Sequence, residues 1–200
     1  MKIGVIAYRG GNVRSICSAL ESLGVELLYT AEWEQLRGCA GLIFPGVGAA
    51  LPAVQDLQRT CLWEKLPTWD RPFLGVCLGM QLLGKESEEG PAPGLGVFSY
   101  AVRPFREAPR VIHMGWNAVS PLMQDPLWYG IESPFYVYFV HGYRADVMDC
   151  TIAEAVYGER FSAAVRRENF WGVQFHPEKS GEVGFKVLQN FLSICKSYQP

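Results

Sequence analysis

Basic residues are not in excess in this sequence, and its charges nearly cancel. Asp and Glu total 20 against 18 Lys and Arg, which leaves a formal net charge of −2. A chain without a basic surplus lacks the electrostatic footprint with which proteins bind nucleic acid or anionic membrane surfaces. We therefore expect neither kind of partner. Because 49% of the residues are hydrophobic and only 19% are charged, the composition is typical of a globular protein.

The sequence also lacks a long uninterrupted apolar segment. Its longest uncharged run, residues 38–55, contains Pro45, Pro52 and four glycines, whereas a membrane-spanning helix needs about 20 predominantly apolar residues. Met1 leads directly into the apolar stretch 3–8 without a basic leader or a small-residue cleavage site, so we expect no signal peptide. These absences predict a soluble protein of the cytoplasm.

Paired metal-ligand motifs are missing as well. No two of the six cysteines form a C-x-x-C pair, and the three histidines show no His-x-x-x-His spacing. A chain of this length can bury a hydrophobic core without disulfide bonds. We therefore expect reduced cysteines and neither a metal nor another cofactor. His113 and His141 have no carboxylate nearby in sequence, which favours roles in binding, packing or an interface.

In the first part of the chain, short apolar runs alternate with amphipathic segments. The apolar runs predict strands at residues 3–8, 26–29, 41–44 and 73–76. Helical spacing of apolar residues predicts helices at 12–23, at 50–62 and from Leu78 to Leu83. Alternating strands and helices predict an α/β fold, in which helices cover both faces of a parallel sheet.

The second part of the chain has a different pattern. Residues 84–94 combine charges, prolines and glycines, which predicts a surface loop. The closely spaced segments after it predict antiparallel strands that extend the sheet, at residues 97–103, 111–114, 135–140, 151–156, 161–166 and 170–175. A last amphipathic helix is expected at 182–198. No repeat or low-complexity linker divides the chain, so we expect one domain over residues 1–200.

Cys77 stands in a sequence context that favours chemistry. It follows the predicted strand 73–76 and lies between Gly75 and Gly79, in the Gly-x-Cys-x-Gly pattern of a nucleophile elbow with cysteine in the serine position. The glycines allow the strand and helix backbones to approach closely, and the start of the helix favours a thiolate. The alternative is a buried structural cysteine. We favour a nucleophile.

A second candidate site lies where the last predicted strand ends. His176 follows the segment 170–175, and Pro177 interrupts the strand directly after it because proline cannot donate a ladder hydrogen bond. Glu178 comes two residues later, and a carboxylate is a suitable partner for orienting an imidazole. The alternative is an incidental polar strand end with Glu178 in solvent. We predict that His176 is a base and that Glu178 orients it.

A glycine-rich turn, Pro45-Gly46-Val47-Gly48, follows a third predicted strand at the same expected edge of the sheet. The backbone N–H groups of such a turn can hold the oxyanion of a tetrahedral intermediate. A phosphate-binding turn is one alternative, although no lysine follows, and an ordinary strand-to-helix turn is another. The position beside Cys77 favours the first interpretation.

In combination, these motifs resemble the class I glutamine amidotransferases of the triad type, over nearly the whole chain. The matching segments are, in order, residues 45–48, 75–81, 138–143 and 172–178. Within that class, residues 3–4 and 11–15 and the segment 113–117 are most similar to the glutaminase subunits of imidazole glycerol phosphate synthases, which act in histidine biosynthesis. The resemblance implies an open, mostly parallel mixed sheet with helices on both faces, of the flavodoxin-like type.

The resemblance also implies a role for each matched residue. Cys77 would attack the side-chain amide of glutamine, His176 would transfer protons, and Glu178 would hold His176. Oxyanion donors would come from the backbone of Leu78 and from the turn at Val47 and Gly48. The implied substrate-binding residues are Gly46, Gln81, His141, Gly142 and Tyr143. The implied partner-interface residues are Asn12, Trp116, Tyr138 and Lys179.

The implied partner is a (β/α)₈-barrel cyclase, which would receive the ammonia in a heterodimer. Two departures from the family pattern stand out. Gly142 replaces a frequent serine or threonine and offers no hydroxyl to glutamine, and residues 7–9 differ from the usual Asp-Tyr-Gly at the partner-facing edge. Alternative functions are a glutaminase subunit of another amidotransferase, a cysteine peptidase on a similar sheet, or a non-catalytic regulatory module.

Overall fold

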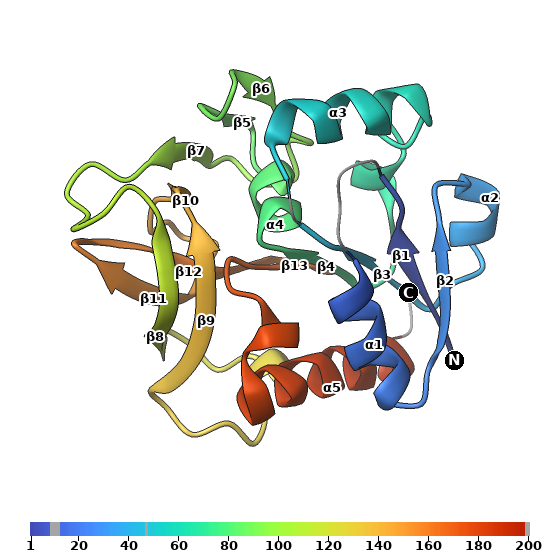
Figure 1. Ribbon diagram of the computed structural model, residues 1–200. Helices are drawn as coiled ribbons and strands as arrows, with labels where there is room; N and C mark the ends of the chain where they lie inside the picture. Colours follow the sequence, from blue (N-terminus) through green and yellow to red (C-terminus); the bar gives the residue numbers. More distant parts are fainter. Residues whose placement is uncertain (9–12, 47, 199–200) are drawn as a thin grey trace.

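The computed structural model describes residues 1–8, 13–46 and 48–198. Figure 1 shows a central sheet with helices on both of its faces. One half of this sheet is parallel and consists, in spatial order, of β2 (Glu26–Thr30), β1 (Lys2–Ile6), β3 (Gly41–Phe44), β4 (Phe73–Val76) and β13 (Phe170–Val173). The order of the first four strands, completed by a fifth from the end of the chain, is that of flavodoxin-like sheets. The expected α/β fold is confirmed.

The other half of the sheet is antiparallel and extends it by four strands, β12 (Glu159–Arg167), β11 (Thr151–Tyr157), β8 (His113–Pro121) and β9 (Phe135–His141). The antiparallel additions predicted at 111–114, 135–140, 151–156 and 161–166 are therefore confirmed. The prediction is wrong for 170–175, because β13 pairs in parallel with β4, and for 97–103, which contributes to a second sheet. The strand expected at 111–114 is wrong in its bounds, because β8 continues to Pro121. Its mixture of polar, small and apolar residues hides the strand, and pairing with β9 stabilises it.

A second, smaller sheet contains β10 (Tyr143–Ala145), β7 (Ala101–Pro104), β5 (Glu86–Ser87) and β6 (Ala92–Pro93). Two predictions are wrong here. Residues 84–94 include two short strands, and the strand expected at 97–103 begins only at Ala101. Val97 and Phe98 are apolar because they are buried in the core. Their burial, and not strand pairing, explains the pattern.

The helices cover the two faces of the main sheet. On one face lie α1 (Arg14–Ser22) and α5 (Gly181–Ser197); on the other lie α2 (Trp33–Leu36), α3 (Ala50–Arg59) and α4 (Leu78–Leu83), as Figure 1 shows. Three short 3₁₀ helices, η1 (Leu66–Thr68), η2 (Pro126–Trp128) and η3 (Pro177–Lys179), complete the fold. Side chains of β3 alternate between two cores, with Ile43 packed in one and Leu42 and Phe44 in the other. None of the helices in the described part of the chain has the length and apolarity that a bilayer crossing requires.

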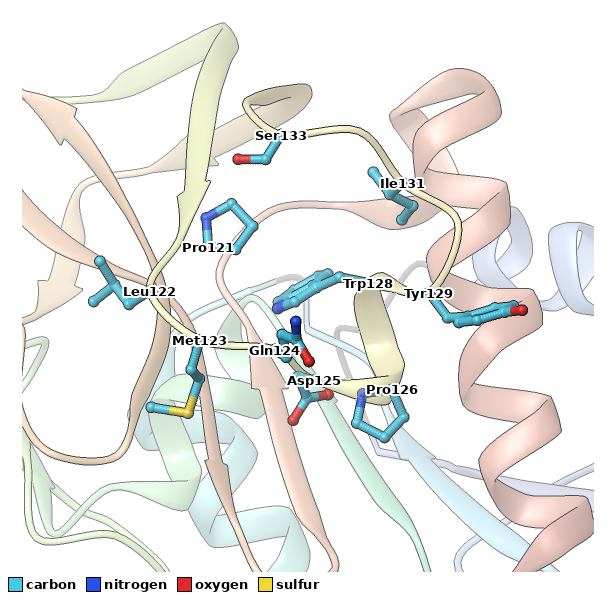
Figure 2. Close-up of a pocket in the computed structure, with 10 residues that line it drawn as sticks. All are labelled: Pro121, Leu122, Met123, Gln124, Asp125, Pro126, Trp128, Tyr129, Ile131 and Ser133. Carbon is cyan, nitrogen blue, oxygen red and sulfur yellow. The ribbon is translucent and has the colours of Figure 1, made fainter.

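The loop between β8 and β9 borders a cavity of about 810 Å³ (Figure 2). Asp125 anchors this loop from inside the protein: its carboxylate accepts hydrogen bonds from the backbone N–H of Leu127 (2.8 Å) and from Trp171 Nε1 (3.1 Å), and it pairs with Arg166 (2.9 Å). The bond to Trp171 connects the loop to β13. None of the predicted site residues that the structure describes lines this cavity, so it is separate from the predicted site.

Candidate active site

Three chain segments meet where the neighbouring parallel strands β3, β4 and β13 end. The glycine-rich turn follows β3, Cys77 follows β4, and His176 lies just beyond β13. Ligands of open α/β sheets bind in the crevice outside the carboxyl ends of the strands, and here that edge holds a cavity of about 320 Å³. The cavity is lined by Gly46, Gly48, Cys77, Leu78, Gln81, Glu89, Ile112, Val140, His141, Gly142, Tyr143 and His176.

Cys77 occupies a sharp turn between β4 and α4, and its backbone has φ 52° and ψ −105°. Such a positive φ is costly for a residue with a side chain and is typical of functional turns. The flanking glycines are required by close backbone contacts. A Cβ atom on Gly79 would lie 2.0 Å from the carbonyl oxygen of Phe44, and one on Gly75 would lie 2.7 Å from the backbone of Gly79. The cysteine side chain is thereby presented at the cavity, as the sequence predicted.

His176 and Glu178 form a buried hydrogen-bonded pair. The imidazole Nδ1 lies 2.9 Å from a carboxylate oxygen of Glu178 and therefore carries a proton. His176 is 1% exposed, and its backbone N–H donates to the carbonyl of Tyr138 (2.9 Å). Nε2, the other ring nitrogen, has no hydrogen bond of standard geometry within the described part of the chain. It is the nitrogen left for the interaction of the imidazole with the Cys77 side chain.

Opposing effects act on the pKa of His176. Burial lowers this pKa, but hydrogen bonds and charge interactions with Cys77 and Glu178 outweigh burial and raise it to about 9. At neutral pH the imidazole is therefore protonated on both nitrogens. Nε2–H is then a proton donor at the cavity, beside Cys77.

This raised pKa predicts how stability depends on pH. Because the folded-state pKa of about 9 exceeds the ordinary value of 6.5, the stabilisation is complete below pH 6.5 and is lost as pH rises through 9. The loss should be at most roughly 3 kcal/mol in the free energy of unfolding. Urea denaturation of the wild type and of His176→Gln across this range measures it. An equal change in both proteins would contradict the prediction.

Two buried glutamines form a hydrogen-bonded chain that ends at the sulfur of Cys77. Gln81 Nε2 donates to the carbonyl of Tyr143 (2.9 Å) and to Gln174 Oε1 (3.1 Å), and Gln174 Nε2 lies 3.5 Å from the sulfur of Cys77. Sequence reasoning gave Gln174 no role. Its signal was present, since Gln174 is the one polar residue in the otherwise apolar or glycine segment 170–175.

The five predicted substrate-binding residues all line the cavity. Of the predicted oxyanion residues, Leu78 and Gly48 line it, and Val47 lies outside the described residues. Gly46 packs directly against the start of α4, where a Cβ atom on it would lie 2.3 Å from the backbone nitrogen of Leu78. The structure therefore brings the turn and the Leu78 N–H together.

Glu89 is a cavity residue that sequence reasoning missed. It belongs to the segment 84–94, which was expected to be an ordinary surface loop. Burial raises the pKa of its carboxyl group, although the backbone N–H of Ala50, 3.3 Å away, lowers it. No local pattern marks this residue, because only the folding of the loop over the cavity brings it there. Within the described ranges, no group of three or more His, Cys, Asp or Glu side chains is arranged to hold a metal ion.

Three predicted interface residues gather on one surface near His176. The rings of Trp116 and Tyr138 are 6.4 Å apart, and the ammonium group of Lys179 lies 5.9 Å from the Tyr138 ring. Asn12 lies outside the described residues. Sequence reasoning missed the exposed side chains of Met114, on β8, and Tyr136, on β9. The two strands carrying these residues pair with each other, which places an exposed apolar surface beside the cavity.

Comparisons with known proteins agree on the kind of protein this chain resembles. The family model "Glutamine amidotransferase class-I" matches residues 5–195. Imidazole glycerol phosphate synthase subunit HisH of Bacteroides fragilis is 43% identical over 97% of this chain and 100% of its own length. The same protein of Methanocaldococcus jannaschii is 40% identical, covering 96% and 99%.

Solved structures agree in fold. A putative GMP synthase protein from Thermoplasma acidophilum superposes with a TM-score of 0.75 at 22% identity, covering 99% of this chain and 95% of the other. The PurLQS structure from Thermotoga maritima superposes with a TM-score of 0.71 at 22% identity, covering 96% and 97%. At 22% identity, these similarities show a shared fold and nothing about function.

Proposed function

The chain belongs to the class I glutamine amidotransferases and, within them, to the HisH subunits of imidazole glycerol phosphate synthase, and from this premise we propose how it acts as the glutaminase of histidine biosynthesis. Cys77, His176 and Glu178 perform the hydrolysis of glutamine to glutamate and ammonia. The observation that carries this assignment is that Cys77 and the Glu178-bound imidazole of His176 line the same cavity.

The first half of the reaction forms a glutamyl thioester. The Cys77 thiolate attacks the side-chain amide carbon of glutamine, so that a carbon–sulfur bond forms and the carbon–nitrogen bond breaks. His176 Nε2–H gives its proton to the departing nitrogen, which leaves as ammonia. The pKa of about 9 supports this role, because the imidazole holds that proton at neutral pH.

The second half of the reaction restores the enzyme. His176, now neutral at Nε2, takes a proton from water while the water oxygen attacks the thioester carbon. The carbon–sulfur bond breaks, glutamate leaves, and Cys77 is again a thiolate paired with a protonated imidazole. Glu178 keeps its hydrogen bond to Nδ1 in both halves and stabilises the imidazolium each time it forms.

The size and charge of the cavity suit a single amino acid. A volume of about 320 Å³ is at the lower end for ligand sites and is small for a peptide chain, which disfavours a cysteine peptidase. Glu89 adds a carboxylate that can pair with the α-ammonium group of glutamine. His141, Gly142 and Tyr143 also line the cavity. Because Gly142 has no side chain, any contact it makes with the substrate comes from its backbone.

The Leu78 N–H and an N–H of the turn that contains Val47 and Gly48 hold the oxyanion of the tetrahedral intermediate. The close packing of Gly46 on the Leu78 nitrogen supports this arrangement. We further propose that the turn reorients to direct its N–H at the oxyanion and that partner binding favours the reoriented state. The isolated glutaminase would then turn over slowly.

The partner we propose is a (β/α)₈-barrel cyclase, which docks on the exposed surface around Trp116, Tyr138 and Lys179 and forms a cytoplasmic heterodimer. Ammonia released into water would be protonated and lost as a nucleophile, so a closed path between the two sites preserves it. The position of the surface beside the cavity supports such a path.

The test compares ammonia release from glutamine by the isolated glutaminase, with the cyclase, and with the cyclase and its nucleotide substrate. We expect an increase of about 10²–10³-fold in the full complex, the effect of one oxyanion donor. Trp116→Ala should weaken the increase, whereas Tyr129→Ala, an exposed aromatic on the loop between β8 and β9, should not. Equal rates in all three mixtures would refute the gating, and no ammonia in any of them would refute the function.

A further inference from the structure

Gln174 is fully buried beside the nucleophile, and the two half-reactions do not use it. It lies just beyond β13, is 0% exposed, and has hydrogen-bond partners at both ends of its side-chain amide, Gln81 and Cys77. A buried amide with this placement is either a packing element or a group that acts on the sulfur. The direction of its hydrogen bonds distinguishes these roles.

One backbone carbonyl determines that direction. Tyr143 O can only accept, so the Gln81 atom 2.9 Å from it is the amide nitrogen. That same nitrogen lies 3.1 Å from one end of the Gln174 amide, which must then be the oxygen. The end of Gln174 that lies 3.5 Å from the Cys77 sulfur is therefore the NH₂ group, a donor. The amide orientation thus follows from the contacts.

A second chain of hydrogen bonds, which begins at Asn117, also ends at the carbonyl of Tyr143. Asn117 is oriented by the backbone, because its Nδ2 donates to Val156 O (2.8 Å) and its Oδ1 accepts from Ala118 N (2.8 Å). Nδ2 then donates to His113 Nε2 (3.2 Å), which leaves the proton of His113 on Nδ1, facing His141.

The two histidines continue the chain of hydrogen bonds in the same donor-to-acceptor direction, and it ends at the carbonyl of Tyr143. His113 Nδ1 donates to His141 Nε2 (3.1 Å), and His141 Nδ1 donates to Tyr143 O (2.8 Å). Burial lowers the pKa of His113 to about 4 and the pKa of His141 to about 3, so both rings are neutral, as these single tautomers require. Tyr143 O therefore accepts two hydrogen bonds, one from His141 and one from Gln81. Because the carbonyl can only accept, the amide nitrogen of Gln81 must face it.

We propose that Gln174 donates a hydrogen bond to the Cys77 thiolate and stabilises it, and that Gln81 and the carbonyl of Tyr143 hold Gln174 in the donating orientation. Gln174 is thereby a catalytic residue that contacts the reacting sulfur, and Gln81 is a positioning residue in addition to lining the cavity. A hydrogen bond to a charged acceptor in a buried site is stronger than one to a neutral thiol. The assignment rests on Cys77 being the nucleophile of the proposed function.

The test follows the reactivity of Cys77 and does not need turnover. The full-length protein is treated with iodoacetamide over a range of pH, and mass spectrometry of the Cys77 peptide separates this thiol from the other five. In Gln174→Leu and Gln174→Met, we expect the pH midpoint of alkylation to rise by about one unit or more, because a hydrogen bond to the thiolate is lost. Gln174→Met is unbranched like glutamine, adds no charge beside the sulfur and guards against a folding defect in the leucine variant.

The neighbouring titratable groups are the same in every variant. His176, His141 and Glu89 share the cavity with Cys77, and Glu178 lies behind His176. The matched control is Asn190→Leu, which also removes a buried amide that donates two hydrogen bonds, to Leu127 O and Tyr129 O, away from the cavity. Its midpoint should equal that of the wild type.

The outcomes separate the inference from the proposed function. Unchanged midpoints in both Gln174 variants, or an equal shift in Asn190→Leu, would overturn the role of Gln174 while leaving the nucleophile in place. Failure of Cys77 to react at any pH in the wild type would overturn both, because no activated thiol would then exist at the site.

Discussion

Cys77→Ser is expected to reduce glutamine hydrolysis by about 10⁴-fold or more, the scale on which loss of a nucleophile acts in related catalytic triads. Serine fits the strained turn as well as cysteine does, so the fold and the cavity should persist. A hydroxyl, however, is far less acidic than a thiol and is not ionised at neutral pH, so the variant lacks the anionic nucleophile. Ammonia release by the complex with the cyclase measures this loss.

The complex supplies an internal control for this variant. Ammonium salt added in place of glutamine should still drive the cyclase reaction in Cys77→Ser, because only the source of ammonia has been removed. Cys61→Ser, which changes an exposed cysteine outside the cavity, should behave as the wild type. Full glutaminase activity in Cys77→Ser would eliminate the thioester mechanism.

Labelling by an electrophilic glutamine analogue tests the same residue in another way. The analogue should modify wild-type Cys77 and leave Cys77→Ser unmodified at that position. A wild-type protein that resists modification would support the alternative of a regulatory module that retains the fold without turnover.

Glu178→Gln is expected to lower kcat/KM by about 10²–10⁴-fold, the usual contribution of a group that supports general acid–base catalysis. The substitution keeps the shape of the side chain and an oxygen that can accept from His176 Nδ1, but it removes the negative charge. Since Glu178 helps to raise the pKa of His176 to about 9, the alkaline limb of the kcat/KM profile should also move to lower pH. Kinetics of the complex across this range would show both effects.

The shift of the pH profile is what separates a catalytic effect from a structural one. A variant that merely loosened the fold would lose activity at every pH without moving the midpoint. Glu182→Gln, which changes an exposed carboxylate in the first turn of α5, provides the matched control and should alter neither quantity. A Glu178→Gln enzyme with the wild-type profile would contradict the proposed orientation of His176.

Local sequence patterns were sufficient for the elements that carry the candidate triad. The strands at 41–44 and 73–76 have the predicted bounds, because each is a short, fully buried run next to a proline: Pro45 follows the first, and Pro72 precedes the second. The glycines around Cys77 predicted a close approach of strand and helix, and the structure contains that approach. His176 and Glu178 are near neighbours in sequence, so their hydrogen bond required no knowledge of the fold.

Local sequence patterns failed where the role of a residue depends on its contacts with residues far away in the chain. Val97 and Phe98 are apolar because they are buried in the core, which periodicity cannot distinguish from strand formation. Glu89 reaches the cavity only because its loop folds over it. The direction of the Gln174 amide depends on a carbonyl 31 residues away along the chain, at Tyr143, through a side chain from α4.

The sequence by itself determined the strands that carry the candidate triad and the residues with the chemistry for a thiol nucleophile, a base and its carboxylate, because these depend on neighbours along the chain. Only the tertiary structure decided that the thiol and the base share one cavity, that Glu89 joins them, and that Gln174 presents a donor to the sulfur. Hydrogen-bond direction and burial depend on contacts between distant segments, and the packing of the sheet is what creates those contacts.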